Sequence, residues 1–280
     1  KNDKDKLHSY LYKQIMLNYG FQDLNSPAVL KLRNSYQNAF SHYLAGFVFE
    51  ALNEPSLARP GYVKAGELNP TNTLITKSID DIDNDVRPKA GYTDLLIVQA
   101  VGHAPEIKSL EKTLPINLNG IADDDSCVQS VNVFYPKLIL DKANASLYPY
   151  SLDGKAITPL PMTNVNLMAQ RALKDSMPHI IFRNIAGAVR DITTEKLACR
   201  AGGKNKAGGT VLSFGAALLG RYLDKADERT WVLLPAQINI NRASLVYGKH
   251  TLSVNVQGKM HRLTFFLNQP YQLIAYRIMG

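Results

Sequence analysis

The feature that most constrains the fold is a change in hydrophobic periodicity near residues 84 to 92. From Leu7 to about Asp83, apolar residues recur at spacings of three and four, which predicts amphipathic helices. After Arg87-Pro88 the apolar runs are short, β-branched or aromatic, and bounded by Gly, Pro or Asp, which is typical of strands. The change predicts an α+β protein with a helical domain over residues 1–88 and a mixed, β-rich domain over residues 89–280.

A second helical block interrupts the β-rich part. An apolar face at helical spacing follows Asn164, Pro178 predicts a break or kink in it, and another helix is expected over Val211–Tyr222. We therefore expect helices to be inserted over about residues 164–225 beside a β-sandwich-like core. The predicted strands are Thr93–Val101, Leu114–Leu118, Val131–Tyr135, Trp231–Leu234, Ala236–Ile240, Thr251–Val256, Leu263–Leu267 and Tyr271–Ile278.

One segment of the helical part matches the pattern of the tetratricopeptide repeat, a helical hairpin of about 34 residues. The residues in register are Gly46, Phe49, Ala58, Tyr62, Ala65 and Pro70. Small side chains at Gly46 and Ala58 let two antiparallel helices approach closely, while Phe49 and Tyr62 fill the space between them. The match predicts one tetratricopeptide-like hairpin in the N-terminal domain.

The segment also departs from the repeat pattern. His42 stands where the pattern favours tryptophan, and Pro60-Gly61 lies inside the second helix, where it should kink the chain or delay the helix start. No second copy of the repeat is visible, and a lone hairpin cannot bury both of its faces. We expect flanking helices over Leu7–Tyr19 and Asn72–Asp83 to cover it. A hairpin that only packs on the rest of the protein is the structural alternative.

Charge and cysteine content narrow the functional classes. The formal charge of +8 is spread thinly, without a run of five or more basic residues, which argues against nucleic-acid binding. No stretch approaches the roughly 20 apolar residues of a membrane-spanning helix. Cys127 and Cys199 are the only cysteines. They suit either a single disulfide in an exported protein or two unrelated buried side chains.

Patterns typical of catalysis or metal binding are weak. The loop over residues 202–210 has the wrong order of Gly, Lys and Thr for a phosphate-binding loop. Asp123-Asp124-Asp125 lacks the alternating spacing of a calcium loop, and the six histidines form no pair at i and i+4. Neither cysteine lies in a recognisable nucleophile context. We therefore predict no catalytic residues, no metal site and no cofactor.

With these residues in view, the chain resembles a group of poorly characterised Gram-negative cell-envelope proteins, commonly predicted lipoproteins, that combine one tetratricopeptide-like hairpin with a β-rich C-terminal half. The resemblance covers most of the chain. It rests on Tyr43-Leu-Ala-Gly46, Glu50-Ala-Leu-Asn-Glu54, Tyr62-Val-Lys-Ala65, Asn69-Pro70, Ala226-Asp-Glu-Arg-Thr-Trp231, Leu234-Pro-Ala236 and Tyr247-Gly-Lys-His-Thr-Leu252. It implies a periplasmic location, outer-membrane attachment through a lipidated cysteine upstream of Lys1, and envelope partners.

The functional hypothesis is a non-catalytic scaffold or adaptor. Its expected partners are other envelope proteins, among them lipoproteins of cell-wall synthesis or envelope assembly. If the hairpin binds through its concave face, the predicted contacts are His42, Tyr43, Phe49, Glu50 and Arg59. The alternatives are a structural subunit of a large envelope assembly and a cell-wall glycan-binding protein or enzyme, for which the basic surface would suit anionic polymers.

Overall fold

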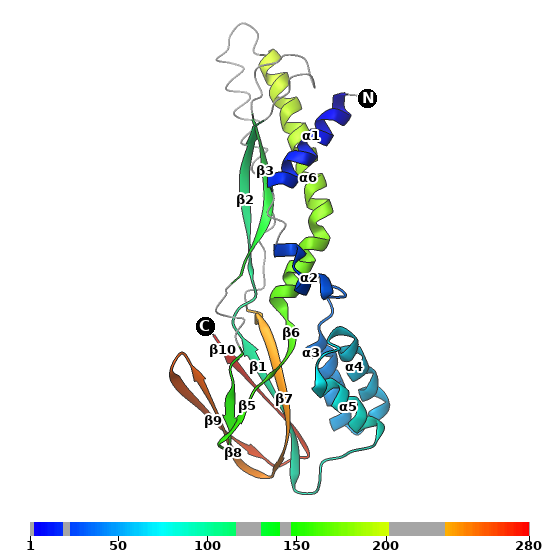
Figure 1. Ribbon diagram of the computed structural model, residues 1–280, viewed down its shortest axis with the longest axis vertical. Helices are drawn as coiled ribbons and strands as arrows, with labels where there is room; N and C mark the ends of the chain where they lie inside the picture. Colours follow the sequence, from blue (N-terminus) through cyan, green and yellow to red (C-terminus); the bar gives the residue numbers. More distant parts are fainter. Residues whose placement is uncertain (1–2, 19–22, 116–129, 141–146, 202–232, 280) are drawn as a thin grey trace. The chain divides into compact units, whose positions relative to one another are not determined.

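The computed structural model describes residues 3–18, 23–115, 130–140, 147–201 and 233–279. It contains both helices and several sheets, so the predicted α+β class is confirmed (Figure 1). The chain forms two compact units. Unit 1 comprises residues 1–27, 106–139 and 170–230, and unit 2 comprises residues 28–105, 140–169 and 231–280.

Unit 1 is built from helices around a two-stranded antiparallel sheet. Its elements are α1 (Asp3–Asn18), the short 3-10 helix η1 (Asp23–Asn25), β2 (Glu106–Pro115), β3 (Ser130–Ile139) and, from Gln170 onward, α6 (Val165–Ala201). Buried side chains from α1, both strands and α6 form one hydrophobic core. A hydrogen bond connects α6 to β3: Asn184 Oδ1 accepts the backbone N–H of Phe134 at 2.9 Å.

Unit 2 contains two four-stranded sheets. The first has the order β10-β1-β7-β6, with β1 parallel to β10 and antiparallel to β7. The second has the order β5-β4-β8-β9. The strands are β1 (Tyr92–Val101), β4 (Tyr150–Leu152), β5 (Lys155–Ile157), β6 (Leu160–Asn164), β7 (Gln237–Val246), β8 (Gly248–Val256), β9 (Lys259–Leu267) and β10 (Tyr271–Ile278).

Strand β1 lies between two hydrophobic cores. Side chains alternate across a strand. Leu95 and Ile97 therefore point into a core shared with the second sheet, whereas Leu96 and Val98 point into a core shared with helices. All four side chains are buried. The continuous apolar run of β1 is explained by this double burial.

Helices α3 (Ala39–Ala51), α4 (Pro55–Leu68) and α5 (Thr73–Asp83) cover the other face of the first sheet, after the short α2 (Pro27–Lys31). Local signals define their ends. Asn38 Oδ1 accepts the backbone N–H of Ser41 at the start of α3, and Asn72 Oδ1 accepts that of Leu74 at the start of α5. Helix α4 runs through Pro60, so the expected delay of the helix start does not occur.

The compact units do not follow the boundary that we predicted between residues 88 and 89. Helices α3 to α5 share a core with β1, β6 and β7, so they belong to the same unit as the sheet. Periodicity reports local structure and does not show which elements pack together. Pro178, where a break or kink was expected, lies inside the continuous helix α6, so the chain does not break there. The predicted helix over Val211–Tyr222 and the start of the strand over Trp231–Leu234 lie outside the described residues.

Two glycines of α4 provide a matched test of the α3–α4 packing. A Cβ on Gly61 would lie 2.8 Å from the backbone nitrogen of Gly46 and 2.8 Å from the carbonyl oxygen of His42, whereas a Cβ on Gly66 would make ordinary contact with Ile75. We expect Gly61→Ala to lower the free energy of unfolding by about 1 to 3 kcal/mol, because two backbones must separate. Gly66→Ala should raise it by up to about 1 kcal/mol. Urea unfolding of both variants measures the difference, and equal effects would contradict the close approach.

Candidate functional site

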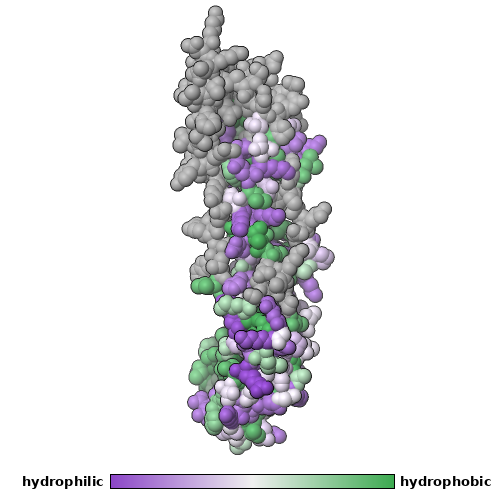
Figure 2. Space-filling view, turned by 90° about the vertical axis from the view of Figure 1, so that its left-hand side faces the viewer, coloured by the Kyte–Doolittle hydropathy of each residue, from purple (hydrophilic) through white to green (hydrophobic). Residues whose placement is uncertain are grey.

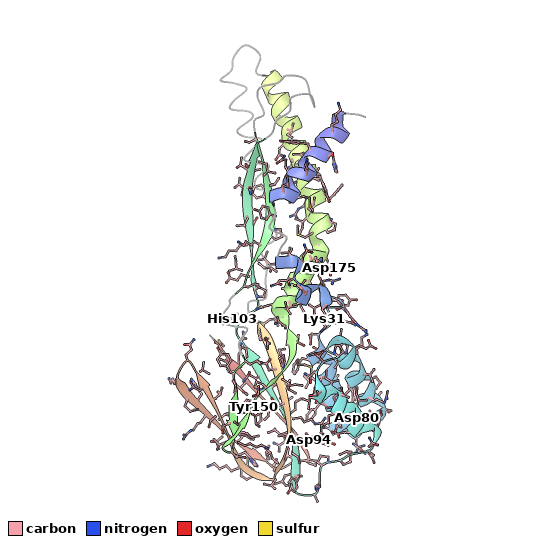
Figure 3. The ribbon with its side chains drawn as sticks, in the orientation of Figure 1. Lys31, Asp80, Asp94, His103, Tyr150 and Asp175 are labelled. Atoms are coloured by element: carbon pink, nitrogen blue, oxygen red, sulfur yellow. The ribbon has the colours of Figure 1, made fainter. Side chains whose placement is uncertain are left out.

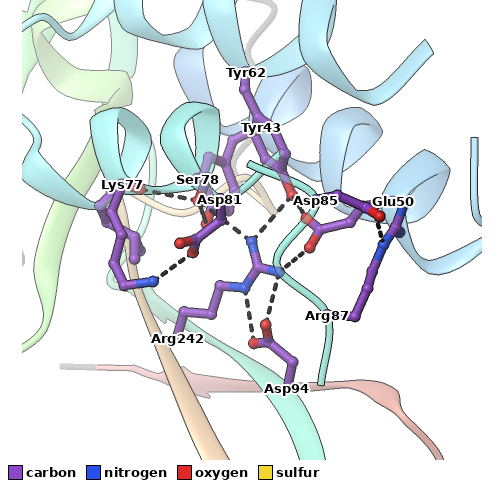
Figure 4. Close-up of polar contacts among 11 residues, drawn as sticks. Tyr43, Glu50, Tyr62, Lys77, Ser78, Asp81, Asp85, Arg87, Asp94 and Arg242 are labelled. Atoms are coloured by element: carbon purple, nitrogen blue, oxygen red, sulfur yellow. Dashed lines mark hydrogen bonds and ion pairs between the residues drawn. The ribbon is translucent and has the colours of Figure 1, made fainter. Parts of the chain in front are cut away.

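A buried network of charged residues in unit 2 centres on Arg242 of β7. Its side chain is 7% exposed and forms ion pairs with Glu50 of α3, at 2.5 Å, and with Asp94 of β1, at 2.8 Å. Asp94 is labelled in Figure 3, and the interactions converge on the guanidinium of Arg242 in Figure 4. One cation thus joins a helix and two strands across 192 and 148 residues of sequence.

Two tyrosines of the helical hairpin complete this network. The Tyr62 hydroxyl donates to Glu50 Oε2 at 2.5 Å and accepts from Arg242 Nη1 at 3.3 Å. The Tyr43 hydroxyl is 2.9 Å from Ser78 Oγ, and the Tyr43 and Tyr62 rings pack with centroids 4.9 Å apart. Each polar tip therefore has a partner inside the protein, as burial requires.

The electrostatics of the network favour fixed protonation states. Burial opposes the charge of Arg242, but hydrogen bonds and ion pairs with Asp94 and Glu50 raise its pKa above the ordinary value. Burial raises the pKa of Tyr43 and of Tyr62, so both hydroxyls stay protonated. The groups bond to one another and lie away from solvent. This arrangement suits a structural connection between hairpin and sheet better than it suits acid–base chemistry.

The structure places the predicted partner contacts in three environments. Tyr43 is 0% and Glu50 2% exposed, so these two residues face the sheet and Arg242, and do not form the partner-facing surface that we expected. His42 and Phe49 are half-buried. Arg59 is exposed and paired with Asp83 at 2.6 Å. The part of the predicted face that contains Tyr43 and Glu50 therefore packs on the protein's own sheet, whereas Arg59 stays at the surface.

The predicted disulfide lies outside what the structure describes. Cys127 falls within residues 116–129, and the side chain of Cys199 is also outside the described part. In the described residues, no group of three or more His, Cys, Asp and Glu side chains is placed to hold a metal ion. No helix there is long and apolar enough to cross a membrane.

A second polar cluster links the β4–β5 turn to β8. Asp153 Oδ2 lies 2.6 Å from His250 Nδ1, Asp153 Oδ1 accepts the backbone N–H of Thr251 at 2.8 Å, and His250 Nε2 lies 2.8 Å from the Val246 carbonyl oxygen. Burial opposes protonation of His250, but its hydrogen bonds to Asp153 and Val246 outweigh burial and raise its pKa. Burial opposes ionisation of Asp153, but its hydrogen bonds to His250 and to the backbone N–H of Thr251 outweigh burial and lower its pKa. Both ring nitrogens face acceptors, so the imidazolium fits this site.

Strand β9 forms an open edge of the second sheet. In the described part of the chain it pairs only with β8. The two strands are joined by the two-residue turn Gln257-Gly258, so Val256 and Lys259 are the pair next to the turn that exchanges backbone hydrogen bonds. Alternate residues of β9 therefore bond to β8. The backbone N–H and C=O groups of the others point outward; these are Met260, Arg262, Thr264 and Phe266.

The side chains on this edge are unusually accessible. Every residue of β9 except Phe265 and Leu267 is exposed, with Phe266 at 65% and Met260 at 54%. The face of unit 2 that is turned toward the viewer in Figure 2 carries hydrophobic and hydrophilic residues side by side. The sequence predicted a strand here, but its position at an edge follows from the strand order.

Comparison of the chain with protein-family models, with curated proteins and with solved structures finds no match. Any proposal for the function therefore depends on the geometry of the described residues. Of the sites above, the Arg242 network and the Asp153–His250 pair are bonded internally. The β9 edge is the site that presents backbone groups and apolar side chains to the outside.

Replacement of Arg242 should be strongly destabilising. In Arg242→Met, Glu50 and Asp94 lose their shared cation, and Glu50 stays buried. Breaking a buried ion pair in this way costs about 3 to 5 kcal/mol, measured as a fall in the free energy of unfolding in urea at pH 7. Arg59→Met removes the same side chain from an exposed ion pair and should change stability much less. Similar losses in the two variants would refute the structural role of the network.

The Asp153–His250 pair predicts a pH dependence of stability. The raised pKa of His250 means that its contribution is fully present below the unfolded pKa of about 6.5 and is lost as pH rises through the folded pKa. We expect the free energy of unfolding to decline as pH rises from about 6.5 through the raised pKa of His250, with a shallower decline in His250→Gln. The exposed His261, replaced by Gln, serves as the control. A His250→Gln profile that parallels the wild type would argue against the pair.

Proposed function

We propose that this protein is a non-catalytic scaffold that binds other proteins of the cell envelope, and that a partner pairs with it along β9. The observation that carries the proposal is the nine-residue β9 edge, with outward backbone groups and exposed apolar side chains. An added strand from a partner would gain main-chain hydrogen bonds there, and alternate side chains would provide selectivity. A periplasmic, outer-membrane-associated location, through a lipidated cysteine upstream of Lys1, is part of the same proposal.

The β6 edge of the first sheet and the β9 edge of the second sheet differ in how their backbone groups are covered, and this difference supports a role for β9. At the β6 edge, the side-chain amide of Asn69 donates to the carbonyls of Pro161 and Met162, and that of Asn72 donates to Pro161. Side chains from the connection between α4 and α5 thus bond to backbone carbonyls at this edge. Strand β9 is long, keeps an unbroken register with β8 and contains no proline. Proteins usually protect such edges, so an open one is consistent with a docking site.

Charge favours an acidic partner strand. Strands β8 and β9 together contain Lys249, Lys259 and Arg262 and no Asp or Glu. A second copy of the chain would bring like charges together, which disfavours self-pairing. A strand with acidic residues opposite Arg262 and apolar residues opposite Phe266 would complement the edge. The proposed partner is therefore a different protein that contributes an acidic, extended segment.

Thr264 allows a direct test, because its backbone N–H points away from β8. Proline at such a position is tolerated in an edge strand but removes the outward donor and places its ring in the path of a partner. We expect Thr264→Pro to reduce partner binding by more than about tenfold, whereas Thr264→Val, which keeps the N–H, should bind normally. Binding is measured in whole envelopes by photo-crosslinking from a reactive residue at position 260 of the full-length protein.

The crosslinked products distinguish the possible occupants. A discrete adduct that maps to an extended acidic segment of another protein, is lost in Thr264→Pro and is kept in Thr264→Val would support the proposal. Urea unfolding checks that both variants fold. An adduct with twice the mass of the chain would instead indicate a structural subunit that assembles with itself. Adducts that persist in a folded Thr264→Pro variant would exclude β9 as the binding site.

A further inference from the structure

Unit 1 contains a cavity beside α6 with a volume of about 450 Å³. Leu24, Ile181 and Ile185 line it and belong to the buried core. Tyr12 of α1 and Phe182 of α6 also line it but are exposed, Phe182 at 63%, so the cavity opens to the outside. Its size falls in the range of small-molecule sites, which are largely apolar with a few fixed polar groups.

The residues of α6 that line the cavity follow one face of the helix, with a charged residue at one end. Lys174, Met177, Ile181 and Ile185 recur at spacings of three and four along α6, so they share one face of the helix. This face extends for about 16 Å from Lys174 to Ile185 at the α-helical rise. Lys174 lies at one end, where its Nζ donates to Asn25 Oδ1 at 2.9 Å. The cavity is therefore an apolar track with a cation at one end.

Charge distinguishes the candidate ligands. Among the described residues that line the cavity, Lys174 is the full positive charge and there is no Asp or Glu. An anionic group near Lys174 and Asn25 would gain charge-assisted hydrogen bonds, whereas a cationic group would meet repulsion. The apolar track leading away from that end suits a flexible hydrocarbon. Methionine and aromatic side chains in the lining can adapt to such a chain.

We propose that this cavity binds a single acyl chain, with the anionic head group of the ligand at Lys174 and Asn25. A free fatty acid and a single-chain phospholipid both provide this chemistry, through a carboxylate or a phosphate. The site lies in unit 1, so the proposal does not depend on partner binding at β9 in unit 2.

The test uses the full chain and displacement of the fluorescent fatty acid cis-parinaric acid. Myristic acid, myristyl alcohol and a lysophosphatidylglycerol with the same acyl chain serve as competitors. We expect Lys174→Met to weaken binding of myristic acid about tenfold, because one ion pair is lost, and to leave the uncharged alcohol nearly unchanged. Arg183→Met removes an exposed cation from the same helix outside the cavity and should change neither affinity.

A second variant, which fills the cavity, tests whether the ligand binds inside it. Ile181→Trp should abolish displacement by every competitor, with folding checked by thermal unfolding. Equal binding of the acid and the lysophospholipid would assign the site to any anionic single chain, and a clear preference would identify the source. The proposal is overturned if the wild type does not take up the probe, or if Lys174→Met and Arg183→Met bind myristic acid alike. Binding only to vesicles of phosphatidylglycerol, or displacement only by an amphipathic peptide, would overturn it too.

Discussion

The architecture of unit 2 depends on the buried charge of Arg242. A guanidinium inside a protein needs enough partners to offset the loss of water, and here Glu50, Asp94 and Tyr62 supply them from a helix of the hairpin, a strand and the second helix. Displacement of any of these elements would leave the buried guanidinium short of a partner. The guanidinium therefore selects how the hairpin sits on the sheet, whereas the apolar contacts around it would tolerate small shifts.

The buried ion pairs also indicate that the helical hairpin has a structural role within unit 2. Its small residues bring α3 and α4 together as a repeat hairpin requires, but the face of α3 with Tyr43 and Glu50 is occupied by the sheet of the same chain. The hairpin thus helps to form the core of unit 2. If the protein binds partners, surfaces away from this face must do so, and the β9 edge of the second sheet has suitable outward backbone groups.

Local patterns predicted much of the fold, and long-range pairing explains what they missed. Helical spacing and the close approach of two helices at Gly46 were visible in the sequence, as were β1, β7, β8, β9 and β10. The pairing of Glu50 with Arg242 was not, because Arg242 is 192 residues away and no periodicity connects them. The same holds for the β9 edge and for the Lys174–Asn25 contact, which depend on strand order and on the packing of distant segments.

Strand β1 has a consequence for the order in which the chain can fold. Its neighbours are β7 and β10, so Leu95 pairs with Ala243 on one side and with Gln272 on the other. During synthesis, β1 emerges long before β7 and β10. Its apolar residues can pair with these strands only when nearly the last segment of the chain is available. Contacts of such long sequence separation form slowly. The local α3–α4 hairpin is available much earlier as a cover for one face of β1, which would shield it from aggregation until the C-terminal strand arrives.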